Sequence, residues 1–317
     1  MPEVAWPTSA EVQAAVAERL QRVLDECDGP VAAVARRALV AGSGVLSERP
    51  HSLTSVVPPG ACITAGGHWR AALWPAAAAE LVMAAADVFD DLADADPASS
   101  GSREPDEYTH GVLLTAAAGT LALASVAAVR VVDDGASPAT AAALARVLGD
   151  QFVRAANGQA VNLAPHQRVD PVLAYRQAAA KSGPLGSLIA RLGALTATED
   201  PRLVDLLGEF GRRLAVHSQL LNDARDAAPG AAQHKADVRT GARTVPLAFT
   251  GSTGAPPDLD AVDLTAWEDR ERAHIQAGGG LAAAVALAQA ERLRAAQILD
   301  TLEGMGRPVA GLRALIA

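Results

Sequence analysis

Long alanine- and leucine-rich segments, each closed by proline or glycine, recur along this chain. Alanine and leucine are strong helix formers, and the β-branched residues build no convincing period-two runs. The predicted fold class is therefore all-α, a helical bundle around one core. We expect helices near residues 9–27, 30–47, 72–95, 110–132, 138–162, 170–197, 200–227 and 280–303.

Turn residues set the expected boundaries of these helices. Ser137-Pro138 and Asp200-Pro201 each pair an N-cap residue with a proline at the first helical position. The run Val57-Pro58-Pro59-Gly60 is interpreted as a break. Segments 97–107 and 250–262 carry Gly and Pro and are expected to be mobile loops within one domain spanning residues 1–317.

Charge and composition exclude several classes of function. The formal net charge is -9, whereas a protein that wraps nucleic acid needs a basic face, so we expect no nucleic-acid partner. Cys27 and Cys62 match no zinc spacing and are expected to be small buried residues. Residues 1–6 do not resemble a secretory signal, and the apolar run 112–129 is interpreted as a buried helix. We expect no membrane span and a cytoplasmic location.

A carboxylate cluster ends one of the apolar segments. Asp87, Asp91 and Asp94 share one helical face by their 3–4 spacing, and Asp90 lies one turn before Asp94. Residues 80–96 include no Lys or Arg, so the cluster is costly unless it is solvated or binds a cation. Oxygen ligands at one-turn spacing suit Mg²⁺, which also takes oxygens from substrate phosphates. The alternative is a solvated helix end.

A second cluster of oxygen ligands strengthens the metal interpretation. Asn222 and Asp226 lie one turn apart with Asp223 between them, again at the end of an apolar helix. Two such clusters can face each other across a bundle. Metal ligands combined with separated cations suit a diphosphate, and an alanine- and leucine-lined cavity suits an apolar tail. The available cations are Lys181, Lys235 and Arg243.

In this order the motifs resemble those of the trans-type polyprenyl synthetase family, the isoprenoid diphosphate synthases with the class I isoprenoid synthase fold. Residues 90–94 match the family's DDxxD motif, and residues 222–226 resemble its second aspartate-rich motif with Asn222 in place of the first aspartate. Further similarities are residues 158–163 to its GQxxDL motif, with Asn162 in place of the aspartate, Lys181-Ser182-Gly183 to its KTG motif, and residues 237–247 to its DLxxGKxTLP stretch. The resemblance covers residues 60–250.

The resemblance implies a Mg²⁺-dependent prenyltransferase of isoprenoid biosynthesis with a central apolar cavity. Three ions would assist loss of diphosphate from an allylic prenyl diphosphate, and the resulting cation would couple to an acceptor. Gln219 would face the reacting end, beside the catalytic Asp90 and Asp94. The implied metal ligands are Asp90, Asp91, Asp94, Asn222, Asp223 and Asp226, and the implied contacts of the leaving diphosphate are Lys181, Lys235 and Arg243.

The chain departs from the family at the expected site of isopentenyl diphosphate. The segment Gly66-Gly67-His68-Trp69-Arg70 is interpreted as a degenerate GGKRxR motif, with His68 and Arg70 as its remaining diphosphate contacts. After Asp94 a single late arginine, Arg103, stands where the family has two. The acceptor is therefore either isopentenyl diphosphate bound differently or a non-standard nucleophile.

Two further readings stay open beside prenyl transfer. A class I terpene synthase acting on a C15–C20 prenyl diphosphate needs no second diphosphate, although the chain has few aromatic residues to stabilise migrating cations. A non-catalytic subunit of a prenyl synthase would need neither metal cluster.

Three further expectations concern packing. Ala85, Ala86 and Phe89 are expected to line the pocket that sets chain length, with the two alanines leaving room for a C15–C20 or longer tail. The family resemblance implies a homodimer. The mixed-charge stretch 267–272 is interpreted as a solvated helix face.

Overall fold

The computed structural model describes the chain except residues 1–5, 49–51, 94–107, 164–169, 231–236 and 255–260, and the side chains of 261–263. Every regular element in the described ranges is a helix, which confirms the predicted all-α class. The elements are α1 (Ser9–Asp25), α2 (Pro30–Ala41), α3 (Leu53–Ala65), η1 (Trp69–Ala72), α4 (Leu73–Ala93), α5 (His110–Val129), η3 (Arg130–Val132), α6 (Pro138–Leu163), α7 (Pro171–Ala194), α8 (Pro201–Asp226), α9 (Asp237–Thr240), α10 (Val245–Thr250), α11 (Ala261–Ala277), α12 (Gly280–Gly304) and α13 (Ala310–Ala314).

Local capping explains where several helices begin. The Asp200 side chain accepts a hydrogen bond from the Arg202 amide, and Pro201 occupies the first helical position of α8. Ser137 accepts likewise from the Thr140 amide before Pro138. Both predicted helix starts are confirmed.

The predicted break at residues 57–60 is wrong, because α3 runs through both prolines. Each proline removes one amide donor, but the helix persists when the surrounding packing compensates. Pro58, Pro59 and Gly60 are all buried, and Gly193 of α7 lies directly against the backbone of Pro58. Tertiary contact therefore holds a helix that local sequence disfavours.

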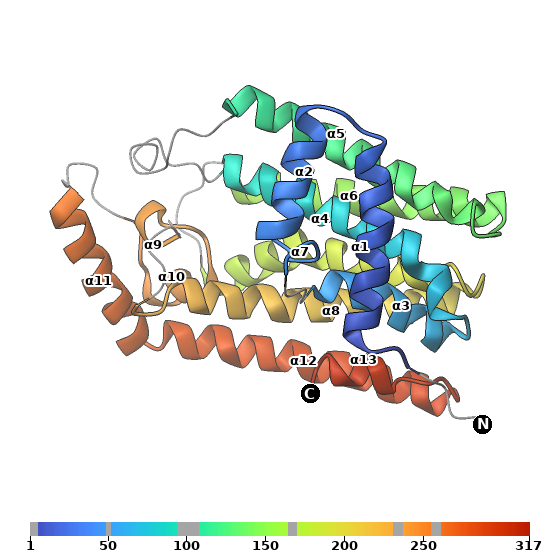
Figure 1. Cartoon of the computed structure of the whole chain (residues 1–317). Helices are drawn as coiled ribbons and strands as arrows, with labels where there is room; N and C mark the ends of the chain where they lie inside the picture. The colour runs from blue at the N-terminus through green and yellow to red at the C-terminus, as the bar shows by residue number, and fades with distance from the viewer. Residues whose placement is uncertain (1–5, 49–51, 94–107, 164–169, 231–236, 255–260) are drawn as a thin grey trace.

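The central helices carry the main core. Figure 1 shows α5 along the upper edge of the bundle, α12 along the lower edge below α8, and α1 and α2 crossing in front of α4. The largest cluster of buried apolar side chains joins α1, α3, α4, α7 and α8. Gly186 of α7 and Gly211 of α8 lie against each other's backbone, so these two helices approach closely where they line the site.

Helix α5 differs from the expected buried helix. Its buried residues are small, whereas Leu114 is 49% exposed and Val126 is 44% exposed. Two helical stretches in the described chain, 69–93 and 110–132, have the length and composition of a membrane span, with 72% and 33% of their apolar windows buried. The first is an ordinary core helix of the bundle. The second leaves apolar side chains such as Leu114 and Val126 exposed on the surface of the bundle.

The interpretation of residues 267–272 as a solvated face is also wrong in part. Glu268 and Arg272 of α11 are buried. Arg239 donates to Glu268 across 2.7 Å, and Arg272 donates to the backbone carbonyl of Asp226 at the end of α8. These contacts fasten α11 to the end of the helix that carries the second oxygen cluster.

Candidate active site

Four helices enclose a cavity of about 270 Å³ with a polar rim and apolar walls. Helix α4 contributes Asp90 and α8 contributes Asn222, so the two predicted oxygen clusters share this cavity. Lys181 of α7 and Gln219 of α8 complete the rim. The apolar lining comes from small and aliphatic residues, namely Leu53, Val57, Met83, Ala86, Leu185, Gly186, Ile189, Gly211, Leu214 and Ala215.

Asp90 is held by side chains from two other helices. The Lys181 ammonium lies 2.7 Å from Oδ1 and 2.9 Å from Oδ2 of Asp90. The Gln159 amide nitrogen on α6 donates to Oδ1 across 2.6 Å. Gly158 makes this arrangement possible, because a Cβ at that position would collide with the backbone of Ala180 and Lys181. Two segments distant in sequence from Asp90 thus converge on its carboxylate.

The α8 cluster forms a second hydrogen-bonded group. Asn222 lies on the cavity rim, and its side-chain oxygen accepts a hydrogen bond of 2.8 Å from Arg225. Ser182 of α7 donates to Gln219 across 2.9 Å, and Gln219 donates to Asp223 across 2.7 Å. Gln219 therefore connects the cavity wall to the buried carboxyl behind it.

Asp223 is the most strongly perturbed of these acids. Burial raises its pKa from 3.8 to about 7, and the nearby Asp237 and Asp226 add to the increase. The hydrogen bond from Gln219 and the charge of Lys181 act in the opposite direction. Since the side chain is only 4% exposed, desolvation of the carboxylate is the dominant cause. Near neutral pH, Asp223 is balanced between its acid and its carboxylate.

The donor set fits the implied Mg²⁺, since every candidate ligand offers oxygen. Within the described part of the chain, no group of three or more His, Cys, Asp or Glu side chains gathers closely enough to hold an ion by itself. Mg²⁺ is commonly held by one or two carboxylates together with water and substrate phosphates, so this arrangement agrees with binding in company with a diphosphate.

The other implied metal ligands occupy different positions. Asp91 is exposed next to Asp90 and lies outside the cavity lining. Asp226 is half-buried at the end of α8. Asp94 and two predicted diphosphate contacts, Arg103 and Lys235, lie outside the described residues.

The Arg243 side chain makes a contact within the protein. Its guanidinium donates to the backbone carbonyl of Asn162 across 2.7 Å, connecting the turn before α10 to the end of α6. It is absent from the cavity lining. A contact with diphosphate remains a prediction for this residue.

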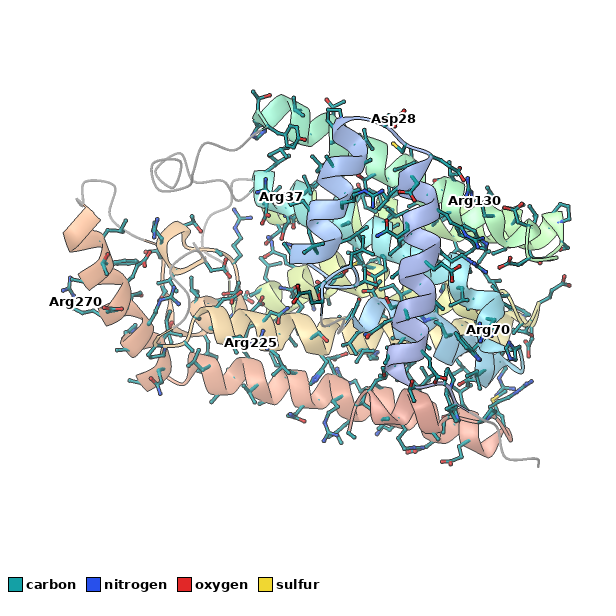
Figure 2. The ribbon with its side chains drawn as sticks, viewed as in Figure 1. Asp28, Arg37, Arg70, Arg130, Arg225 and Arg270 are labelled. Atoms are coloured by element: carbon teal, nitrogen blue, oxygen red, sulfur yellow. The ribbon has the colours of Figure 1, made fainter. Side chains whose placement is uncertain are left out.

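His68 and Arg70 are far from both oxygen clusters, which corrects their assignment as diphosphate contacts. They precede α4, whereas Asp90 is near its other end, roughly 25 Å away along the axis at 1.5 Å per residue. Arg70 lies over the Trp69 ring, and His68 caps η1 by accepting from the Arg70 amide. Figure 2 shows Arg70 toward one end of the bundle and Arg225 toward the other. The departure from GGKRxR in this segment therefore gives no information about the acceptor.

The cavity is lined by only one of the three residues expected to set chain length. Ala86 lines the cavity, but Ala85 is fully buried against other helices, and Phe89 is partly exposed away from the lining. Met83, one turn before Ala86, lies at the cavity wall and was not predicted. Helical phase explains the difference, because adjacent residues point in directions about 100° apart.

Two polar residues of the site were given no role by the sequence analysis. Gln159 was noted as part of a motif, yet its bond to Asp90 depends on the close packing of α6 and α7. Asp87 lines the cavity beside Ala86, and its 3–4 spacing from the other aspartates was the available signal.

Comparisons with solved structures identify the fold. The chain is similar to a geranylgeranyl pyrophosphate synthetase from the archaeon Geoglobus acetivorans, with TM-score 0.76, 17% identity and coverage of 97% of this chain and 96% of that one. A polyprenyl synthetase from Streptomyces coelicolor A3(2) gives TM-score 0.77 at 18% identity, covering 97% of both chains. A geranylgeranyl pyrophosphate synthase from Corynebacterium glutamicum, complexed with isoprenyl diphosphate and magnesium, gives 0.71 at 20% identity, covering 98% of both.

Comparisons by sequence add nothing to this result, since no protein-family model and no curated protein matches the chain. The structural similarity extends over nearly the full length of each chain at low identity. The chain therefore has the all-α fold of the isoprenoid diphosphate synthases.

Proposed function

We propose that this protein is a Mg²⁺-dependent prenyltransferase that ionises an allylic prenyl diphosphate and couples the resulting cation to an acceptor. The observation that carries the proposal is the cavity, on whose rim Asp90 and Asn222 from separate helices meet Lys181 above apolar walls. One end of this space suits a metal-bound diphosphate and the other suits a hydrocarbon tail. The full-length similarity to prenyl synthases supports this reading.

Different residues would hold the metal ions, contact the diphosphate and exclude water. Asp90, with Asp94, and Asn222, with Asp226, would hold the metal ions, and Lys181 would contact the leaving diphosphate. When bound, Mg²⁺ neutralises charge on the leaving diphosphate oxygens. The aliphatic walls keep water from the reactive carbon, which protects the cation from hydrolysis. Gln219 would present its amide near the reacting end of the substrate.

Prenyl transfer is favoured over cyclisation by the cavity lining. No aromatic side chain is among the cavity-lining residues in the described part of the chain, whereas a cyclase benefits from aromatic faces that stabilise migrating cations. The acceptor is isopentenyl diphosphate or another nucleophile. A terpene synthase acting on a C15–C20 prenyl diphosphate is the second candidate.

Product analysis tests the proposal. The protein would be incubated with Mg²⁺, geranyl, farnesyl or geranylgeranyl diphosphate, and isopentenyl diphosphate, and the products analysed by mass spectrometry. We expect a prenylated product and release of diphosphate that chelation of Mg²⁺ abolishes. Hydrocarbons or terpene alcohols would favour cyclisation, and no turnover of any substrate would favour a non-catalytic subunit.

A matched pair of variants connects the activity to the cavity. Asp90→Asn removes one carboxylate charge and should lower kcat by about 100-fold or more, the scale expected when a group that stabilises charge in the transition state is lost. Asp150→Asn changes an exposed acid on α6 in the same chemical way and should leave kcat unchanged.

We also propose that the protein is a homodimer formed through α5 and α6. Leu114 and Val126 of α5 and Val153 and Val161 of α6 are each at least 44% exposed. An exposed apolar surface of this kind is typical of an interface, and a two-fold dimer lets the same surface cover itself.

A further inference from the structure

Asp90 has no unoccupied carboxylate oxygen in this structure. The Lys181 ammonium contacts both oxygens at 2.7 and 2.9 Å, and the Gln159 amide adds a bond of 2.6 Å to Oδ1. The side chains of Lys181 and Asp90 are 26% and 35% exposed, so water screens this pair only partly. A cation that binds Asp90 therefore competes with these donors for the carboxylate oxygens.

Only the nitrogen of the Gln159 side-chain amide has a hydrogen-bond partner. Its nitrogen bonds to Asp90, but its oxygen Oε1 is buried without a hydrogen-bond partner. A buried acceptor left unpaired raises the free energy of the state that contains it. The arrangement around Asp90 therefore favours its own replacement once a ligand brings a new donor, such as a metal-bound water.

We propose that Lys181 and Gln159 form a latch on Asp90, which couples the binding of metal to the binding of diphosphate. This inference rests on the proposed function, since it concerns the same ligands. Lys181 and Gln159 act as positioning residues: they hold Asp90 in place and compete with a cation for its oxygens until both ligands are present.

Charge accounts for the coupling. A divalent cation alone at Asp90 would repel the Lys181 ammonium and remove its contacts of 2.7 and 2.9 Å with that carboxylate, with no phosphate to replace them. A diphosphate alone that attracts Lys181 would leave the Asp90 carboxylate facing the phosphate oxygens. When both ligands bind, Lys181 exchanges a carboxylate for phosphate, and Asp90 exchanges an ammonium for the metal. Each ligand therefore strengthens the binding of the other, as linkage requires.

The sharpest test measures metal affinity without any diphosphate. Binding of Mn²⁺, as a probe for Mg²⁺, would be followed by electron paramagnetic resonance and by calorimetry in wild type, Lys181→Met and Gln159→Leu. We expect both variants to bind Mn²⁺ more tightly than wild type, by about 5- to 150-fold. Gln159→Leu removes one of the three contacts on Asp90 without changing the charge of the protein, so its gain should be smaller than that of Lys181→Met.

Controls separate the latch from general effects. Lys181→Arg keeps a cation within reach of Asp90 and should stay close to wild type. Arg191→Met breaks another ion pair of α7, the pair with Asp205 at 2.8 Å, and should leave Mn²⁺ affinity unchanged. Circular dichroism and thermal melts of each variant verify that it is folded.

A second measurement adds inorganic pyrophosphate. In wild type it should raise Mn²⁺ affinity, and this enhancement should be reduced in Lys181→Met under identical solution conditions. Unchanged or weaker Mn²⁺ binding by folded Gln159→Leu overturns the latch and leaves the proposed function standing. Wild-type protein that binds neither Mn²⁺ nor pyrophosphate, alone or together, overturns the proposed function as well as the latch.

Discussion

Gly158 of α6 lies directly against the backbone carbonyl of Ala180 on α7. The next residue on each helix, Gln159 and Lys181, contacts Asp90. The absence of a side chain at residue 158 therefore sets the spacing of two helices and the position of the two donors that hold the first motif aspartate.

Replacing Gly158 tests this spacing. Gly158→Ala forces a methyl group into backbone atoms of α7 and should lower the free energy of unfolding by ~1–3 kcal/mol. Gly149→Ala on the same helix has open space around it and should raise that free energy by ~0.5–1 kcal/mol through helix propensity. Urea denaturation of both variants measures the difference, and equal effects at the two positions would contradict the close contact.

The pKa of Asp223 predicts how stability depends on pH. Its folded value of about 7 exceeds the ordinary 3.8, so the folded state binds the proton more tightly than the unfolded state. The stability this provides is complete below the unfolded pKa and is lost as the pH rises through the folded pKa. The side chain in Asp223→Asn cannot ionise. The melting temperature of this variant should therefore rise relative to that of wild type as the pH rises from about 5 to about 8.

Thermal melts in buffer containing a chelator measure this effect without bound metal. Asp150→Asn, at an exposed acid on α6, serves as the control. A constant difference between Asp223→Asn and wild type across the range would show that the pKa is ordinary.

The cavity lining predicts which alanine sets the length of the tail. Ala86→Phe places a ring inside the cavity and should shift the preferred substrate toward a shorter prenyl chain. Ala85→Phe places the same ring in a closed core and should instead destabilise the protein by ~1–3 kcal/mol. Competition between prenyl diphosphates of different length, together with denaturation curves, separates the two outcomes. A length shift in folded Ala85→Phe alone would reverse the assignment.

The exposed face of α5 and α6 predicts self-association. The double variant Leu114→Glu, Val153→Glu introduces charge into this face and should convert a dimer into a monomer, as judged by light scattering after size exclusion. Leu293→Glu on α12, where the wild-type side chain is 56% exposed, should leave the dimer intact. A wild-type monomer would refute the interface, and a monomer that binds lipid vesicles would assign the face to a membrane surface.

The sequence is most informative where local chemistry determines structure. Caps such as Asp200 with Pro201 set helix starts within a few residues, so these boundaries were predictable. The prolines of α3 were misjudged because their cost is offset by packing against Gly193, a contact between residues distant in sequence.

At the candidate site, too, the features set by local motifs were predictable and those set by helix packing were not. The meeting of Asp90 and Asn222 followed from two motifs in a known order, and the cavity brings both residues together. The wrong prediction for His68 and Arg70 has a physical reason, because a short glycine-containing pattern does not reveal its distance from Asp90 in the folded chain. Gln159 received no role because its contact with Asp90 depends on how closely two helices pack, which a single sequence does not reveal.

The alanine-rich interior of α4 has a consequence for adaptation. Ala76, Ala77, Ala78 and Ala79 are completely buried, so neighbouring helices rest nearly on the α4 backbone. Further along the same helix, α4 reaches the cavity below its rim through Met83 and the small Ala86, so the size of the cavity depends on the separation of the helix axes and on a few larger side chains such as Met83. One enlarged or reduced side chain can alter which molecule is accommodated while the scaffold keeps its shape, so new substrate preferences are within reach of single mutations.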